Sequence, residues 1–273
     1  MPELPEVETV LRTLEYQLGD VGITDVKVFY PKMIEGDPSD FVKRLKGQHF
    51  RRYLRRGKYL LFEMDDLTLE AHLRMEGKFF IQPAGTPKAK HDHVIFTLSD
   101  GRQLHYNDVR KFGRMALIPK RKSYARFRDL GPEPLSSAYN SPYVAKYFAG
   151  TPRKVKEVLL DQHFCAGIGN IYADEMLYGA RIHPCTPCNK LTEKEIRSLV
   201  RQGKKILREA ISAGGTTVRS YTSSLGVTGL FQNELRAYGR KDLTCGRCGK
   251  KIVRTVVGGR GTHYCPRCQK EKL

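Results

Sequence analysis

The sequence predicts an α+β protein in which an N-terminal helix and an antiparallel β-sandwich or barrel are followed by a helical domain and a cysteine-rich C-terminal tail. Three observations predict this order. Apolar residues recur with a helical period before Gly19. Short β-rich segments without alternating helices occupy residues 23–119. A helical pattern from about residue 136 to residue 214 precedes two C-x-x-C pairs near the C-terminus.

Composition narrows the class of protein. The 273 residues are 40% hydrophobic and 28% charged, which is typical of a globular chain with real cores and not of a disordered one. No apolar run approaches the roughly 18 residues that span a bilayer, and the acidic N-terminus lacks the pattern of a signal peptide. We therefore expect a cytoplasmic protein without a membrane partner.

The charge balance points to a polyanionic partner. Lys and Arg number 48 against 29 Asp and Glu, a formal net charge of +19. Nucleic acid is the first candidate for a chain this basic. An anionic membrane surface is less favoured, because the sequence contains no helix with a basic face opposite a bulky apolar one.

The first predicted helix begins close to the N-terminus. Pro and Glu begin helices well, Pro through its fixed φ angle and Glu through its interaction with the helix dipole. A second interpretation of Pro2 stays open beside that one. Removal of Met1 would leave Pro2 with a secondary α-amine, and an α-amine has a pKa of about 8 against about 10.4 for lysine. More of it is neutral at pH 7, and a neutral amine is a nucleophile.

Strand signals follow. The segment Ser99–Arg102 joins the last two strands and is typical of a hairpin. A basic run, Arg51–Lys58, places five cations in eight residues; it is either a solvated face or a surface for a polyanion. The predicted strands are Val26–Tyr30, Tyr59–Glu63, Lys78–Gln82, Val94–Leu98 and Gln103–Tyr106.

The helical region has clear start signals. Thr192–Glu195 is a capping box, and the apolar residues that follow it share one helix face. Gly167–Tyr172 opens another helix and is either a plain turn or a place where backbone N–H groups meet a phosphate. The stretch before Gly131–Pro134 marks a boundary, so we expect three domains, at residues 1–125, 126–234 and 235–273.

The cysteines carry the most specific signal. Two C-x-x-C pairs separated by sixteen residues suit four thiolates around one zinc ion, with the intervening chain as a hairpin. The tail has little apolar mass, so metal binding would contribute its folding free energy. The expected zinc ligands are Cys245, Cys248, Cys265 and Cys268.

Three cysteines remain. Cys185 and Cys188 form a third C-x-x-C; they are interpreted as free thiols or a redox-sensitive pair, with metal ligation the less favoured alternative. Cys165 is interpreted as a small hydrophobic residue in the core. Within the tail, Arg260 lies between glycines at the expected hairpin tip, where a guanidinium could hold a phosphate with two hydrogen bonds.

Together with further motifs, these residues resemble the bacterial formamidopyrimidine-DNA glycosylase family. The motifs run from residue 1 to residue 268, and their order and joint presence make the resemblance specific although no single one decides it. They are Met1–Thr9, Arg56–Leu60, His72–Met75, Lys90–His93, Asp108–Gly113, Gly131–Leu135, Gly169–Tyr172 and Gly259–Cys265.

The resemblance implies a fold and an activity. The implied fold is a helix leading into a β-sandwich, a helix–two-turn–helix domain and a zinc ribbon, with DNA in a basic cleft between the halves. The implied enzyme is a bifunctional DNA glycosylase and abasic-site lyase of base excision repair. It excises oxidised purines, such as 8-oxoguanine and formamidopyrimidines, from damaged double-stranded DNA and cleaves the strand by β- and δ-elimination. The resemblance implies a monomer with one structural zinc ion.

Catalytic roles come with the resemblance. Pro2 resembles the nucleophile that forms a Schiff base at C1′ of the damaged nucleotide, and Glu3 resembles the acid/base residue. Lys58 resembles the proton donor assigned to β-elimination and Arg260 the donor assigned to δ-elimination. A guanidinium is a poor acid, so Arg260 is credited mainly with holding phosphate. Glu6 resembles a supporting carboxylate.

A further set of residues is implied to handle the DNA. The target base must leave the stack, and three residues match those that fill the vacated space; without the resemblance they would be core or salt-bridged side chains. These three are Met75, Arg110 and Phe112. The implied DNA contacts are His91, Arg110, Lys156, Asn170 and Tyr238. The chain is less uniformly basic around Lys156 than some relatives, which leaves phosphate contacts there open. Thr217–Ser224 resembles the loop that closes over the extruded base.

Two rival functions remain. Endonuclease VIII, a sibling family, shares the Pro2–Glu3 start and the zinc finger but prefers oxidised pyrimidines; Met75 and the Arg110–Phe112 segment favour the purine enzyme. The other rival is a zinc-dependent DNA-binding protein without catalysis. The joint presence of Pro2, Glu3 and Lys58 argues against that rival.

Overall fold

The computed structural model describes residues 1–120, 125–216 and 229–272. The chain forms two compact units. The N-terminal unit comprises Met1–Arg128 with Gly214–Gly229, and the second unit comprises Asp129–Ala213 with Leu230–Leu273. The α+β class is confirmed, because β-strands dominate the N-terminal unit and helices the second. The predicted boundaries at 125/126 and 234/235 stay a prediction.

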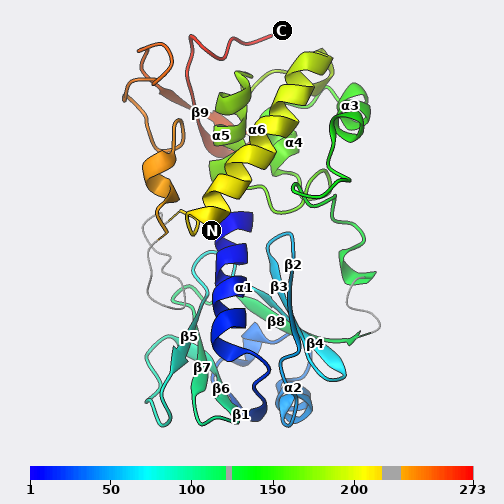
Figure 1. The fold of residues 1–273 in the computed structure, drawn as a ribbon, viewed down its shortest axis with the longest axis vertical. Helices are drawn as coiled ribbons and strands as arrows, with labels where there is room; N and C mark the ends of the chain where they lie inside the picture. The colour runs from blue at the N-terminus through cyan, green and yellow to red at the C-terminus, as the bar shows by residue number, and fades with distance from the viewer. Residues whose placement is uncertain (121–124, 217–228, 273) are drawn as a thin grey trace. The chain divides into compact units, whose positions relative to one another are not determined.

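The predicted N-terminal helix is confirmed as α1, Leu4–Leu18, which ends at Gly19 with a positive φ of 57°. Its apolar stripe is buried because the residues recur every three or four positions and so lie on one face. Figure 1 shows α1 running along the junction of two sheets. The stripe consists of Leu4, Val7, Val10, Leu11, Leu14 and Leu18.

Two four-stranded antiparallel sheets form the sandwich. They pack face to face, with the Phe62 and Phe79 rings, one from each sheet, meeting edge-on at 5.9 Å. The predicted hairpin is confirmed, since Thr97 pairs with Gln103. The first sheet has the order β1 (Ile23–Val28), β6 (Asp92–Leu98), β7 (Gln103–Asn107), β5 (Lys78–Gln82). The second has the order β2 (Arg52–Arg56), β3 (Tyr59–Glu63), β4 (Leu67–His72), β8 (Arg114–Pro119).

Several elements of this unit were not predicted. β4 is buried at all six positions, so it lacks the alternation that identifies a half-buried strand. Glu70 lies within it and breaks the apolar run. A short helix, α2 (Pro38–Leu45), is capped by the Asp37 carboxylate, which accepts the N–H of Asp40. Among the described residues of this unit, 3₁₀ turns lie at Pro31–Met33 and Ala125–Phe127.

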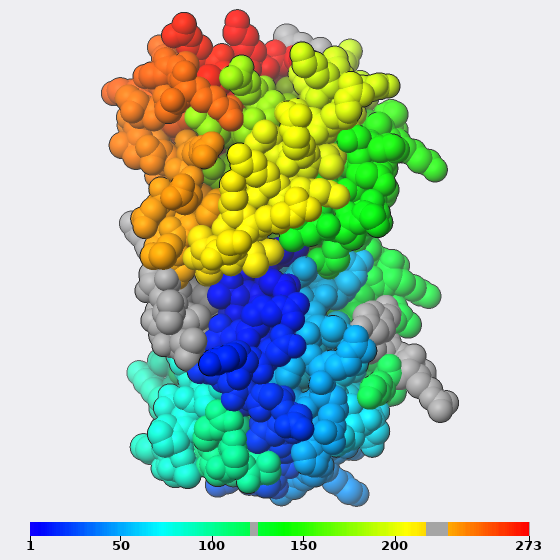
Figure 2. All heavy atoms as spheres, viewed as in Figure 1, coloured from blue at the N-terminus to red at the C-terminus, as the bar shows by residue number. Residues whose placement is uncertain are grey.

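The second unit is built around one buried helix. α5 (Asn170–Ala180) is apolar around most of its surface and packs against α6, whose predicted capping box is confirmed. Figure 2 shows α6 in yellow at the surface beside the green α3 segment. The helices are α3 (Ser141–Ala149), α4 (Val155–Leu160), α5 and α6 (Glu193–Ser212), with 3₁₀ turns at Cys188–Lys190 and Phe231–Glu234.

The cysteine-rich tail packs on α5. Its strands β9 (Val253–Val257) and β10 (Arg260–Tyr264) form the predicted hairpin. Tyr178 of α5 shares a small apolar cluster with Ile252 and two of the cysteines. Across the described residues, no helix is both long and apolar enough to cross a membrane.

Candidate functional site

The N-terminal unit brings the first residues of the chain to a surface hollow. Met1 is half exposed, and it lines a hollow of about 380 Å³ together with Arg74, Met75, Phe112 and Arg114. Pro2, one peptide bond further on, is buried. The hollow therefore gathers the chain terminus and two of the three predicted space-filling residues, which are distant in the sequence.

The start of α1 is held by buried carboxylates. Glu3 is the N-cap residue, with extended backbone, and its N–H donates to Glu6 Oε2 at 2.8 Å. The other oxygen of Glu6 accepts both the N–H of Thr216 at 2.8 Å and its hydroxyl at 3.1 Å. Glu6 thus connects the Pro2–Glu3 end of the helix to the chain that leads into residue 217. The predicted loop Thr217–Ser224 lies outside the described residues.

Lys58 lies within electrostatic reach of His72. It is buried in the turn between β2 and β3. Burial, followed by the positive charges of Arg74 and Lys58, lowers the pKa of His72 to about 3. His72 is therefore neutral, and its Nδ1 accepts the N–H of Arg74 at 3.0 Å. The neutral imidazole adds no further positive charge next to the buried Lys58 and the exposed Arg74.

The predicted intercalating residues Arg110 and Phe112 lie on one turn, residues 108–113, called the 108–113 turn below. Arg110 stacks its guanidinium over the Phe112 ring at 4.7 Å. Both side chains are exposed. Phe112 is thus an exposed aromatic and not a core residue, as the space-filling interpretation requires.

Buried polar groups hold the 108–113 turn on two sides. Asp108 is fully buried, and its two oxygens accept the N–H groups of Arg110 at 3.0 Å and Gly113 at 2.8 Å. Arg114 donates to three backbone carbonyls of the same turn, at 2.7–3.3 Å. His91 lies at its base, where its carbonyl accepts the N–H of Asp108.

Backbone geometry fixes the same turn. Lys111 has a positive φ of 58°, and Gly113 packs so closely on Tyr106 that a Cβ atom there would overlap the phenol oxygen. Asp108 lies in one of the motifs of the sequence, but no role was predicted for it. The sequence signal that could have identified Asp108 is its position as an acidic residue between Asn107 and a basic segment.

The second unit carries the remaining predicted contacts on α4, α5, β10 and the segment before β9. Asn170, the first residue of α5, donates to the carbonyl of Gly261, next to Arg260. Arg260 is exposed at the hairpin tip, after two glycines with positive φ. Tyr238 packs its ring on His263 of β10, with centroids 5.2 Å apart.

Lys156 occupies an unexpected place. It is fully buried, and its ammonium contacts the Asn170 carbonyl at 3.0 Å and Asp174 Oδ1 at 2.5 Å. Asp174 Oδ2 in turn accepts the N–H of His263. In this arrangement Lys156 orders the α5–β10 junction, and its predicted contact with phosphate stays a prediction.

Glu175 is a second buried carboxylate for which no role was predicted from the sequence. Its oxygens accept the N–H groups of Arg236, Ala237 and Tyr238. Burial raises its pKa, while these three donors act in the opposite direction. Asp174 and Glu175 are acids inside an otherwise apolar helix, and that pattern is the sequence signal that could have found them.

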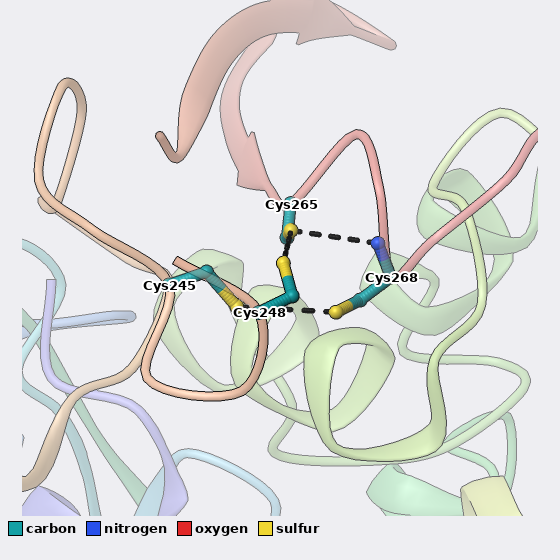
Figure 3. Close-up of side chains that lie close together, drawn as sticks. All are labelled: Cys245, Cys248, Cys265 and Cys268. Carbon is teal, nitrogen blue, oxygen red and sulfur yellow. Dashed lines mark hydrogen bonds between the residues drawn. The ribbon is translucent and has the colours of Figure 1, made fainter. Parts of the chain in front are cut away.

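The four cysteines of the tail form a compact cluster. Figure 3 shows them converging from the two C-x-x-C turns, and their sulfur atoms all lie within 4.8 Å of one another. Cys245 Sγ lies 3.9 Å from Cys268 Sγ, and Cys248 Sγ lies 3.5 Å from Cys265 Sγ. A tetrahedral zinc with Zn–S bonds of about 2.3 Å separates its sulfurs by about 3.8 Å, whereas a disulfide needs about 2 Å. The residues fit one structural zinc ion, as predicted.

Comparison with known proteins agrees with this geometry. Three family models match in order along the chain: the formamidopyrimidine-DNA glycosylase N-terminal domain over residues 1–115, the H2TH domain of the same glycosylases over 130–222, and a zinc finger found in FPG and IleRS over 242–270. The formamidopyrimidine-DNA glycosylase of Bacillus licheniformis is 48% identical over 275 residues, covering 99% of this chain and all of the relative.

Solved structures match over the same length. A mutant of the Lactococcus lactis FPG protein, in complex with DNA containing Fapy-dG, has a TM-score of 0.94 at 42% identity. A structure of MutM in complex with DNA containing carbocyclic 8-oxo-G has a TM-score of 0.93 at 42% identity. Each comparison covers 98% of this chain and all of the other.

Proposed function

The chain belongs to the formamidopyrimidine-DNA glycosylase family, and on that premise we propose that its Pro2 amine is the nucleophile that excises oxidised purines from duplex DNA. The observation that carries this proposal is the position of Met1 on the hollow with Met75 and Phe112. Once Met1 is removed, the terminal nitrogen belongs to Pro2 at the same place. The N-terminal end of α1 favours a neutral amine there, because the helix dipole is positive at that end.

The chemistry follows from the amine. The Pro2 nitrogen attacks C1′, the glycosidic bond breaks, and the base leaves with the bonding electrons and a proton. Opening of the sugar ring then gives an iminium, which accepts electrons as a C2′ proton is removed and the 3′-phosphate leaves. A second elimination releases the 5′-phosphate. Glu3, the N-cap of the helix that bears Pro2, is the group proposed to move protons at the sugar.

The remaining predicted residues receive supporting roles in this proposal. Lys58 is buried near His72 and Arg74, and it is the proposed proton donor for β-elimination. Met75, Arg110 and Phe112 are proposed to fill the space that the extruded base leaves. The exposure of the Arg110–Phe112 pair supports this, since both side chains are free of the core.

In the second unit, Arg260 is proposed to hold the phosphates that flank the lesion. Its exposure at a glycine-rich hairpin tip, and the attachment of that hairpin to Asn170, support a fixed phosphate contact. His91, Lys156, Asn170 and Tyr238 are proposed further DNA contacts.

We also propose that the enzyme acts in the cytoplasm as a monomer. Sedimentation of the free and DNA-bound protein would test the monomeric state.

The decisive experiment blocks the Pro2 nitrogen. A protein that retains Met1, or that carries an N-terminal tag, has an amide at Pro2 whose lone pair is delocalised. Excision and strand cleavage should both be lost, while binding to lesion DNA should persist because the charge and the zinc ribbon are unchanged. Borohydride added during the reaction should trap a protein–DNA adduct at Pro2 in the processed protein only, as read by peptide mass spectrometry. Attachment at Lys58, or full activity with Met1 in place, would overturn the proposal.

Lesion preference needs its own assay. Formamidopyrimidine and 8-oxoguanine are proposed as substrates because similar proteins are solved with DNA that contains these lesions. Duplexes that carry 8-oxoguanine or thymine glycol, each opposite C or A, should be cleaved in favour of the purine lesion. A preference for thymine glycol would instead indicate the activity of the endonuclease VIII sibling.

A further inference from the structure

A second group of metal-ligating side chains lies in the unit that carries the zinc ribbon. His183, Cys185 and Glu271 offer one nitrogen, one sulfur and one carboxylate oxygen, and these atoms all lie within 4.8 Å of one another. His183 is buried, Cys185 is partly buried and Glu271 is exposed. Within the described residues, this group and the four-cysteine cluster are the two that could hold a metal ion.

The fold, and not chance exposure, brings these residues together. His183 and Cys185 lie in the loop after α5. The C-terminal tail returns to this loop because Gln269, itself buried, donates to the carbonyl of Ile182 at 2.8 Å. Lys272 pairs with Glu195 at 2.6 Å. Glu271 therefore lies between two tail residues that are each attached to the helical part of the unit.

The orientation of His183 also suits a ligand. The edge of the Tyr264 ring packs on the imidazole, with centroids 4.5 Å apart and planes at 80°, which fixes the ring. Nδ1 accepts the N–H of Cys185 at 3.2 Å, so its lone pair points toward the residue that bears the thiol. This distance lies at the upper end of the normal range, and a metal ion bound at Nδ1 would replace this hydrogen bond.

The donor set determines the class of metal. One imidazole, one thiolate and one carboxylate are ligands that zinc accepts in sites with three protein ligands and one open position. Bonds of about 2.0–2.3 Å in a tetrahedral site place the donor atoms about 3.4–3.8 Å apart. Separations of up to 4.8 Å therefore need to shorten by at most about 1.4 Å. Rotation of the exposed Glu271 side chain can shorten the two distances that involve its carboxylate.

We propose that His183, Cys185 and Glu271 form a second metal site, for a borderline divalent cation such as Zn²⁺ or Co²⁺, distinct from the structural zinc. With three protein ligands and one exposed member, it binds more weakly than the four-cysteine site. Cys188, the other cysteine of the same C-x-x-C, is buried and stands outside the group. The motif therefore supplies one ligand and not a redox pair.

The experiment uses the full-length protein with its structural zinc in place. Co²⁺ is added while zinc retention is followed by native mass spectrometry and thiolate-to-cobalt charge transfer by near-ultraviolet absorbance. The wild-type protein should take up one Co²⁺ with a charge-transfer band and without loss of zinc. Cys185→Ser should abolish the band, Glu271→Gln should weaken binding by about tenfold or more, and the matched control Cys188→Ala should behave as wild type.

Three results would overturn the proposal. They are the absence of a second equivalent in the wild type, a band that appears only as zinc is displaced, and loss of the band in Cys188→Ala but not in Cys185→Ser. Glu271 is exposed on the C-terminal tail, so Glu271→Gln should leave the fold intact. It therefore tests the site even if the Cys185→Ser protein fails to fold. The readout is independent of glycosylase activity, so neither outcome bears on the role of Pro2.

Discussion

Asp108→Asn tests how the 108–113 turn contributes to the reaction. Asp108 is fully buried, and its two oxygens accept the N–H groups of Arg110 and Gly113. Asparagine has nearly the same shape but only one acceptor oxygen, so its amide NH₂ must face one of these two N–H groups. The substitution thus removes one charge-assisted hydrogen bond and leaves a buried donor unpaired, without opening a cavity.

The magnitude follows from those contacts. A hydrogen bond to a charged group contributes about 1.5–3 kcal/mol, and an unpaired buried donor costs a similar amount. Arg114 still holds the turn from its other side, so we take about 2–3 kcal/mol as the loss for the native turn. At 1.4 kcal/mol per factor of ten, this lowers by roughly 30- to 150-fold the equilibrium constant that favours the conformation presenting Phe112 over other conformations of the turn.

The assay compares two substrates. Excision of a paired 8-oxoguanine requires the base to be unstacked, which costs a few kcal/mol, whereas an abasic site has no base to extrude. Single-turnover excision should therefore fall by about 10- to 100-fold in Asp108→Asn, while strand cleavage at an abasic site changes little. Fluorescence of 2-aminopurine beside the lesion should report the slower unstacking directly.

The control removes the same charge elsewhere. Asp66→Asn deletes a carboxylate at an exposed position of the same unit and should leave both activities unchanged. Phe112→Ala should reproduce the substrate selectivity of Asp108→Asn if the two residues act in one step. An equal loss on both substrates in a folded Asp108→Asn protein would refute the reasoning, as would full excision activity.

Three further predictions follow from the structure. Cys248→Ser should release zinc and unfold the tail, as measured by metal analysis and limited proteolysis; retained zinc would contradict the four-cysteine assignment. Arg260→Ala should weaken binding to damaged and undamaged duplex alike and reduce the salt slope of binding by about one unit, whereas loss of lesion discrimination at an unchanged slope would indicate base reading. Burial raises the pKa of Glu70 from 4.5 to about 7, against the opposing charge of Arg126. A carboxyl group whose pKa is higher in the folded than in the unfolded protein stabilises the fold at pH values below its unfolded pKa, and this contribution is lost as pH rises through about 7. Glu70→Gln should therefore raise the melting temperature relative to wild type more at pH 8 than at pH 5. An equal difference at both pH values would contradict this.

Part of the candidate site was predictable because its signals are local. The period of α1, the Thr192 capping box and the 99–102 hairpin depend on residues a few positions apart, and all three are confirmed. The zinc cysteines belong to this class as well, since each C-x-x-C turn positions its own two sulfurs. The proposed roles of Pro2, Glu3 and Lys58 come from the order of motifs along the chain, which similarity to a family can detect and periodicity cannot.

The α+β class and the four zinc cysteines could be predicted from the sequence, and the residues proposed for the reaction also come from it. Only the tertiary structure decided which polar groups are buried and with which partners. Lys156 was expected to contact DNA, yet it is buried with Asp174; Asp108 was part of a motif without an assigned role, yet it holds the 108–113 turn from within. The reason is physical: hydrogen bonds and periodicity within a few residues are properties of the local chain, whereas burial depends on segments far apart in sequence. Cys185 and Glu271 meet in the same way, through the returning tail.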